Sequence, residues 1–175
     1  MERPGATTMR GKPLTVVGPE LKAGDKAPEF EVVSDSLQPV TLGSTGQAVR
    51  IFSVVPSLDT PVCDAQTKRF NEEAAKLPGV EIYTISMDLP FAQKRWCGAV
   101  GASAVKTLSD YRGNFGETYG VLIKGLNLLA RCIFVINEEG KVTYTQLVKE
   151  VAQEPNYEDV LKALKGGTCG CGGHH

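Results

Sequence analysis

The chain has 175 residues, 42% of them hydrophobic and 22% charged, which suits one globular domain with short tails. Its 19 Lys and Arg against 20 Asp and Glu give a net charge of −1, which argues against nucleic acid or an anionic membrane as the main partner. No apolar run approaches the ~20 residues of a membrane span, and residues 1–17 lack the apolar core of a secretory signal, so we expect a cytoplasmic protein.

The amino-terminal third of the chain is expected to contain short strands. Residues 1–10 are expected to form a flexible terminus. Runs of β-branched and aromatic residues predict strands at residues 14–17, 30–33, 40–42 and 48–55. The last of these runs is the strongest, and it stops at Pro56 because proline does not continue a central strand.

A helix is expected to follow from Pro61 to Leu77. Thr60 before Pro61 is typical of a helix start, with threonine as the N-cap and proline at the first helical position. Apolar residues recur three and four positions apart from Phe70 to Leu77, which predicts a face directed at the core. The Pro-Gly pair at 78–79 ends the helix.

The rest of the chain alternates between strands and helices. Strands are expected at residues 80–86, 105–108, 128–136 and 142–148, with a tight hairpin loop at 137–140. Helices are expected at residues 90–97, 114–119 and 156–165. This order predicts an α/β fold with a mixed sheet flanked by helices, parallel at first and ending in an antiparallel pair. It matches a thioredoxin-like domain over residues 11–165 with an added N-terminal β-hairpin, followed by a flexible tail rich in Gly, Cys and His at 166–175.

Cys63 is the strongest candidate for chemistry. The five cysteines of a chain in a reducing compartment serve catalysis, redox switching or metal binding rather than a disulfide framework. Cys63 would occupy the third position of the helix that begins at Pro61, where unpaired backbone N–H groups and the helix dipole favour a thiolate. The alternative is a small buried hydrophobic residue, as most free cysteines are, and position alone does not separate the two.

The residues around Cys63 resemble the active-site motif of the peroxiredoxins. Pro56, Thr60 and Cys63 stand as P-x-x-x-T-x-x-C, and the string SLDTPVCDAQTKRFNEEAA is similar to the thiol peroxidase branch of that family. The resemblance runs from about residue 11 to residue 165. It implies that Cys63 attacks a peroxide oxygen and becomes a sulfenic acid, with the Thr60 hydroxyl against the thiolate and peroxide. Pro56 would shield the site from water and slow over-oxidation.

The resemblance also implies a role for Arg131, in the string ARCIFVINEEGKVTYTQLV. A guanidinium beside the reactive sulfur would stabilise the thiolate and orient the peroxide oxygens. From composition alone, Arg131 would instead be an edge residue in water. Cys132 follows it on the expected strand and therefore faces the opposite side, so we assign Cys132 to packing.

Cys97, 34 positions after Cys63, is the candidate resolving cysteine that the resemblance implies. Its sulfur would attack the sulfenic acid and close an intrachain disulfide. Both cysteines are expected on helices, with Cα atoms beyond the ~7 Å bridging limit, so local unwinding is expected in each turnover. Gly98 and Gly101 would ease that change. The alternative is a structural cysteine that packs beside Trp96.

The tail lies outside the resemblance. Its four potential ligands are Cys169, Cys171, His174 and His175. Two thiols and two imidazoles can complete a tetrahedral zinc site, although the C-x-C spacing is unusual and a glycine-rich end is costly to order. Three interpretations stay open: a flexible tail, a metal site, and a relay of electrons to a Cys63–Cys97 disulfide.

Three classes of function therefore compete. The resemblance implies a homodimeric peroxidase for hydrogen peroxide and organic hydroperoxides, recycled by thioredoxin, which needs no metal, flavin or nucleotide cofactor. A thiol–disulfide oxidoreductase would show C-x-x-C at the helix start, where this chain has Cys63-Asp64-Ala65-Gln66. A metal or thiol store acting through the tail would leave the Pro56, Thr60 and Cys63 motif unexplained.

Overall fold

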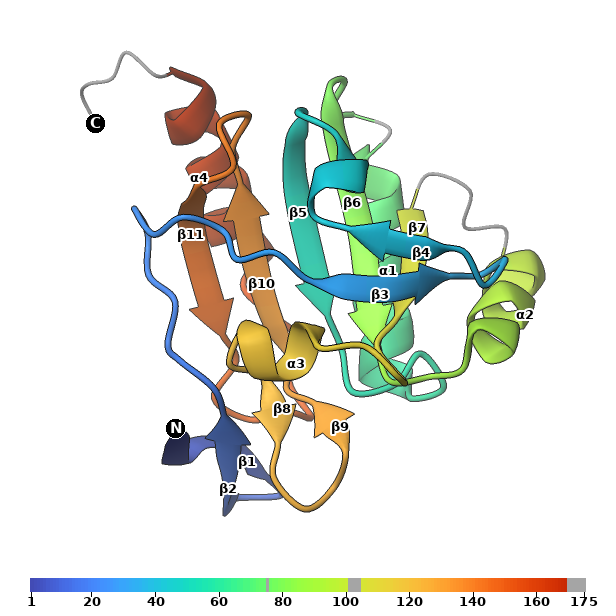
Figure 1. Cartoon of the computed structure of the whole chain (residues 1–175), viewed down its shortest axis with the longest axis vertical. Helices are drawn as coiled ribbons and strands as arrows, with labels where there is room; N and C mark the ends of the chain where they lie inside the picture. The colour runs from blue at the N-terminus through green and yellow to red at the C-terminus, as the bar shows by residue number, and fades with distance from the viewer. Residues whose placement is uncertain (75, 101–104, 170–175) are drawn as a thin grey trace.

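The computed structural model describes residues 1–74, 76–100 and 105–169, which form two β-sheets and four α-helices (Figure 1). The strands are β1 Glu2–Met9, β2 Lys12–Val17, β3 Glu31–Ser34, β4 Pro39–Thr41, β5 Val49–Val54, β6 Val80–Ser86, β7 Val105–Ser109, β8 Leu122–Ile123, β9 Leu128–Leu129, β10 Cys132–Ile136 and β11 Val142–Leu147. The helices are α1 Pro61–Ala74, α2 Pro90–Val100, α3 Phe115–Thr118 and α4 Tyr157–Cys169, with a 3-10 turn, η1, at Gly43–Thr45.

The large sheet is mixed, as the sequence predicts. Its seven strands lie in the order β11-β10-β5-β6-β7-β3-β4. Strands β5, β6 and β7 pair in parallel, and β10 and β11 extend the sheet in antiparallel fashion on one side, as β3 and β4 do on the other. The α/β, thioredoxin-like fold class is confirmed.

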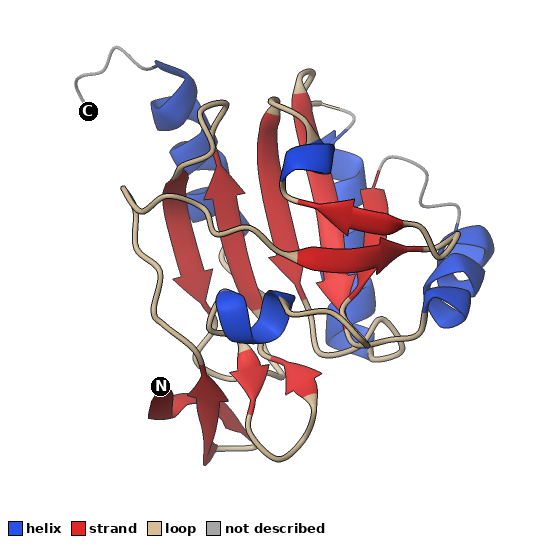
Figure 2. Ribbon diagram, viewed as in Figure 1, coloured by secondary structure: helices blue, strands red, loops and turns tan. Residues whose placement is uncertain are grey.

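The alternation of side chains along β5 and β10 builds a separate core on each face of this sheet. On one face Ile51 and Ile133 pack with Phe70 of α1 and Val160 of α4, so both helices cover the same side (Figure 2). The other face carries an aromatic cluster in which the rings meet mostly edge to face. Its rings belong to Phe30, Phe52, Tyr83, Phe115, Tyr119 and Phe134.

A smaller sheet holds the amino terminus, contrary to the expected flexible stretch over residues 1–10. Its four strands lie in the order β1-β2-β8-β9, and β1 and β2 form an amino-terminal hairpin whose first strand uses the residues expected to be flexible. The buried Thr7 hydroxyl donates to the Val148 carbonyl at 2.9 Å, and the Thr8 N–H donates to the Lys149 carbonyl at 2.8 Å. Polar bonds to a distant segment therefore order β1, which lacks the apolar run that marks a strand in sequence.

Other elements differ from expectation at their ends. The strand expected over residues 128–136 is two strands, because β9 pairs with β8 in the small sheet whereas β10 pairs with β5 and β11 in the large sheet. Helix α2 continues through Gly98 to Val100, and α4 continues beyond residue 165 to Cys169. Gly101 and residues 170–175 lie outside the described residues. No helix in the described part of the chain is long and apolar enough to cross a membrane.

Candidate active site

Cys63 lies in the first turn of α1, at the edge where the parallel strands β5 and β6 end. Its side chain is fully buried in a cluster with Val55 and Leu58, and the half-buried Trp96 packs against that cluster. Pro56, at the end of β5, is also buried. The three residues of the motif therefore lie on one short connection between a strand and a helix.

Thr60 is the N-cap residue by its backbone, because its carbonyl accepts the first helical hydrogen bond, from the Asp64 N–H at 2.9 Å. Its exposed side chain does not cap the helix in the expected way: the hydroxyl donates to the Ser57 carbonyl at 3.0 Å. The Thr67 hydroxyl donates to the Cys63 carbonyl at 2.9 Å. These bonds fix the backbone just before Cys63 and at Cys63 itself.

Asp88 fixes the connection that leads to Cys63, and sequence reasoning missed it. One carboxylate oxygen accepts from the Ser57 hydroxyl at 2.7 Å, and the other accepts from the Leu58 N–H at 2.7 Å and the Ser86 hydroxyl at 2.8 Å. Asp88 follows the carboxyl end of β6, and parallel strands end at the same edge. The signal available in the sequence was the position of Asp88, two residues after the strand that becomes β6. Strand β6 runs parallel to β5, the strand that leads into the motif.

Arg131 reaches the active-site face of α1 from the opposite side. Cys132 pairs with Val54, so Arg131 lies beside the end of β5. Arg131 is 2% exposed. Its Nε and Nη2 donate to the Val151 carbonyl at 2.9 and 2.6 Å, and Nη1 donates to Gln66 Oε1 at 2.9 Å. The interpretation of Arg131 as an edge residue in water is wrong.

Gln66 binds Arg131 from the same helix that carries Cys63, and sequence reasoning missed it. It is fully buried, lies three residues after Cys63 and therefore shares its face of α1, and its amide donates to the Ser53 hydroxyl at 2.7 Å. No acidic side chain pairs with Arg131 in the part of the chain that the structure describes. A buried cation held only by neutral oxygens favours an anion nearby, and a thiolate or a peroxide oxygen meets that need.

Cys97 lies on α2 and is half-buried. Both it and Cys63 are free thiols, on separate helices as expected. Burial raises the pKa of the Cys97 thiol. Its side chain borders a cavity of about 500 Å³ together with Val40, Thr107 and Leu108, whereas the neighbouring Trp96 packs against the cluster that contains Cys63.

Comparison with known proteins agrees with this geometry. The family model described as Redoxin matches residues 22–161. The thiol peroxidase of Bacillus subtilis (strain 168) is 57% identical over 159 residues, which cover 90% of this chain and 95% of that protein. The solved structure of a peroxiredoxin-like protein from Aquifex aeolicus superposes with a TM-score of 0.86 at 49% identity, covering 91% of this chain and 95% of that one.

The chain belongs to the thiol peroxidase branch of the peroxiredoxins. A structure titled as a thiol peroxidase from Chromobacterium violaceum, 21% identical over 93% of this chain and 96% of that one, shares the fold with a TM-score of 0.84. The protein is a thiol-dependent peroxidase of the peroxiredoxin type.

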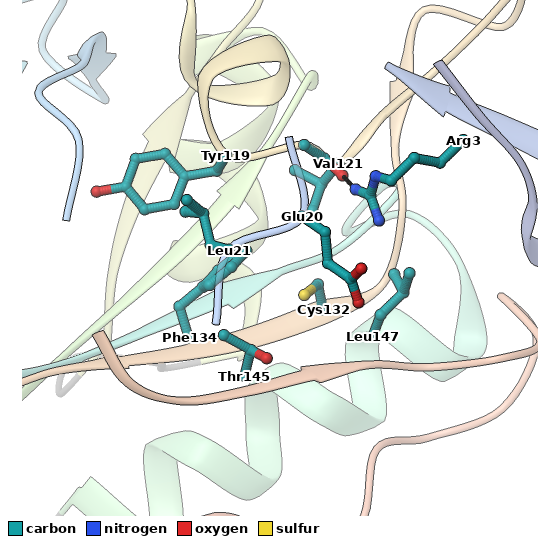
Figure 3. Close-up of a pocket in the computed structure, with 10 residues that line it drawn as sticks. Arg3, Glu20, Leu21, Tyr119, Val121, Cys132, Phe134, Thr145 and Leu147 are labelled. Carbon is teal, nitrogen blue, oxygen red and sulfur yellow. Dashed lines mark hydrogen bonds between the residues drawn. The ribbon is translucent and has the colours of Figure 1, made fainter. Parts of the chain in front are cut away.

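Cys132 of this peroxiredoxin faces away from the site, as expected for a residue assigned to packing. Burial raises the pKa of its thiol to about 12, so it stays protonated at neutral pH. Figure 3 shows its sulfur among Glu20, Phe134 and Thr145 in a separate cavity of about 260 Å³. Arg3 lies at the same cavity and donates to the Gly120 carbonyl.

The candidate metal ligands that the sequence offers lie in the C-terminal tail. Within the described residues, no group of three or more His, Cys, Asp and Glu side chains gathers closely enough to hold a metal ion. Helix α4 ends at Cys169, while Cys171, His174 and His175 lie outside the described residues. The three interpretations of the tail therefore stay predictions.

Proposed function

We propose that this thiol peroxidase reduces hydrogen peroxide and organic hydroperoxides with Cys63 as its nucleophile. The Cys63 thiolate attacks the terminal peroxide oxygen, so that a sulfur–oxygen bond forms and the oxygen–oxygen bond breaks. The departing oxygen takes a proton and leaves as water or an alcohol, and Cys63 becomes a sulfenic acid. The observation that carries this proposal is the buried Arg131 guanidinium, bonded to Gln66 one turn beyond Cys63 and unpaired with any acid in the described chain.

Arg131, Thr60 and Pro56 support that step in the proposal. Arg131 stabilises the thiolate and the charge that develops on the departing oxygen. Thr60, three residues before Cys63 at the helix start, offers its hydroxyl to the bound peroxide. Pro56, buried at the end of β5, limits access of water to the sulfur.

Cys97 is the proposed resolving cysteine. Its sulfur attacks the sulfenic sulfur, so that the disulfide bond forms, the sulfur–oxygen bond breaks, and hydroxide leaves with the Cys97 proton as water. A thioredoxin dithiol then reduces the bridge and is itself oxidised. We further propose a cytoplasmic homodimer, which rests on the family resemblance.

The test is consumption of a panel of hydroperoxides coupled to NADPH, thioredoxin reductase and thioredoxin. Cys63→Ser is expected to abolish turnover, and Cys97→Ser to permit one turnover at most with thioredoxin. Cys132→Ala is the matched control, because its thiol lines a separate cavity, and it is expected to turn over normally. Normal turnover by the Cys63→Ser protein would exclude Cys63 as the nucleophile.

A further inference from the structure

A hydrogen bond joins the neighbours of the two proposed redox cysteines. Asp64 directly follows Cys63, Trp96 directly precedes Cys97, and the Trp96 indole Nε1–H donates to Asp64 Oδ1 at 2.8 Å. The same indole packs in the cluster that contains Cys63. The bond therefore fastens α2 to the first turn of α1, next to the proposed nucleophile.

The direction of the Trp96 side chain decides where Cys97 can point. Consecutive residues of an α-helix project about 100° apart, so with Trp96 bonded to Asp64 of α1 the Cys97 side chain is directed elsewhere. With Trp96 packed against the cluster of Val55, Leu58 and Cys63, the Cys97 thiol borders the cavity beside Val40 and Thr107. The indole thus occupies the side of α2 that Cys97 must present to Cys63 before a disulfide can form.

We propose that the Trp96–Asp64 hydrogen bond is a latch that holds α2 in the reduced arrangement and opens before the disulfide step. The inference rests on the proposed function, in which the Cys97 sulfur displaces hydroxide from the Cys63 sulfenic acid. Trp96 and Asp64 are positioning residues, because they touch neither of the bonds that change. While the latch is closed the sulfenic acid persists, and a second peroxide can oxidise it to a sulfinic acid.

Trp96→Phe tests the latch, since it keeps an aromatic ring at the cluster that contains Cys63 and removes the hydrogen-bond donor. Rapid quenching with a sulfenic-acid trap, followed by intact mass measurement, separates sulfenic acid formation from disulfide formation. We expect the first rate to stay unchanged and the second to rise about tenfold, the factor expected for loss of a hydrogen bond to a carboxylate. The fraction converted to sulfinic acid at a fixed peroxide concentration should fall in parallel.

Lys68→Met is the matched control. Lys68 Nζ pairs with the other carboxylate oxygen of Asp64 at 2.8 Å and is exposed, so this variant removes a partner of Asp64 without touching the indole bond. It should form the disulfide at the wild-type rate. Asp64→Asn keeps an oxygen acceptor but loses the charge, and should fall between wild type and Trp96→Phe.

The wild-type protein gives an independent readout, because Trp96 is the single tryptophan of the sequence. Its emission should shift to longer wavelength together with disulfide formation, and return when the bridge is reduced. Identical emission from the reduced and disulfide forms, or an unchanged disulfide rate in Trp96→Phe, would overturn the latch alone. If no Cys63–Cys97 bridge forms in wild-type protein, both the latch and the proposed role of Cys97 fall.

Discussion

Replacing Gln66 with glutamate would place a carboxylate where Arg131 now bonds to a neutral amide oxygen. Arg131 Nη1 lies 2.9 Å from Gln66 Oε1, so the new charge would pair with the guanidinium directly. The other carboxylate oxygen can accept a bond from the Ser53 hydroxyl, which now accepts one from the Gln66 amide. We therefore expect the fold to tolerate the change. The positive charge that Arg131 offers to Cys63 would, however, be neutralised by the new carboxylate.

The magnitude follows from Coulomb's law. Two unit charges about 4 Å apart in a medium of effective dielectric constant ~20 attract by about 4 kcal/mol, and the new carboxylate would also repel a thiolate one turn away by a similar order. A loss of about 3 kcal/mol in the peroxide step corresponds to a rate constant lowered roughly hundredfold.

Stopped-flow measurement of the second-order reaction of Cys63 with hydrogen peroxide at pH 7 tests this expectation. Gln66→Leu is the comparison: it leaves two buried polar groups without their partner and should lower the free energy of unfolding by about 2–4 kcal/mol, while adding no negative charge. Glutamate should therefore slow peroxide attack more than leucine does, although it harms stability less. If Gln66→Glu reacts at the wild-type rate, Arg131 does not serve Cys63 and the electrostatic argument is wrong.

Three further changes remove carboxylates that hold backbone N–H groups elsewhere in the fold or beside the site. Burial raises the pKa of Asp110 from 3.8 to about 6. Its contribution to the free energy of unfolding, about 3 kcal/mol, is therefore full below pH 4 and is lost as pH rises through 6. In urea unfolding measured from about pH 4 to 7, Asp110→Asn should remove this pH dependence of the free energy of unfolding. Backbone N–H donors, first that of Gly11, lower the pKa of Glu150 to about 2. Its contribution to the free energy of unfolding is therefore present above pH 4.5 and is lost as pH falls through 2. Glu150→Gln should lower the melting temperature at pH 7 and remove this loss of stability in acid. Asp88→Ala removes the acceptor of the Leu58 N–H and should slow peroxide attack in stopped flow, with equal rates contradicting its positioning role.

The central sheet and the motif could be predicted from sequence because each depends on local patterns. Alternation along β5 and β10 encodes two faces, and Thr60-Pro61 encodes the start of α1. The supporting contacts could not be predicted in this way. Gln66 reads as an ordinary polar helix residue, and only the burial of Arg131, 65 positions away, gives its amide a partner. Strand β1 is equally hard to predict from sequence, because its threonines bond to carbonyls about 140 positions along the chain.

The latch has an equilibrium consequence as well as a kinetic one. If Trp96 must leave α1 before Cys97 approaches Cys63, its bond to Asp64 stabilises the dithiol form and not the disulfide. Trp96→Phe should then favour the disulfide about tenfold, which makes its reduction potential more negative by about 30 mV for a two-electron couple. Equilibration with dithiothreitol redox buffers, followed by alkylation and mass measurement, gives the potential directly. Equal potentials for the two proteins would mean that the indole keeps its bond in the disulfide form, and the mutual exclusion of Trp96 and Cys97 at α1 would be wrong.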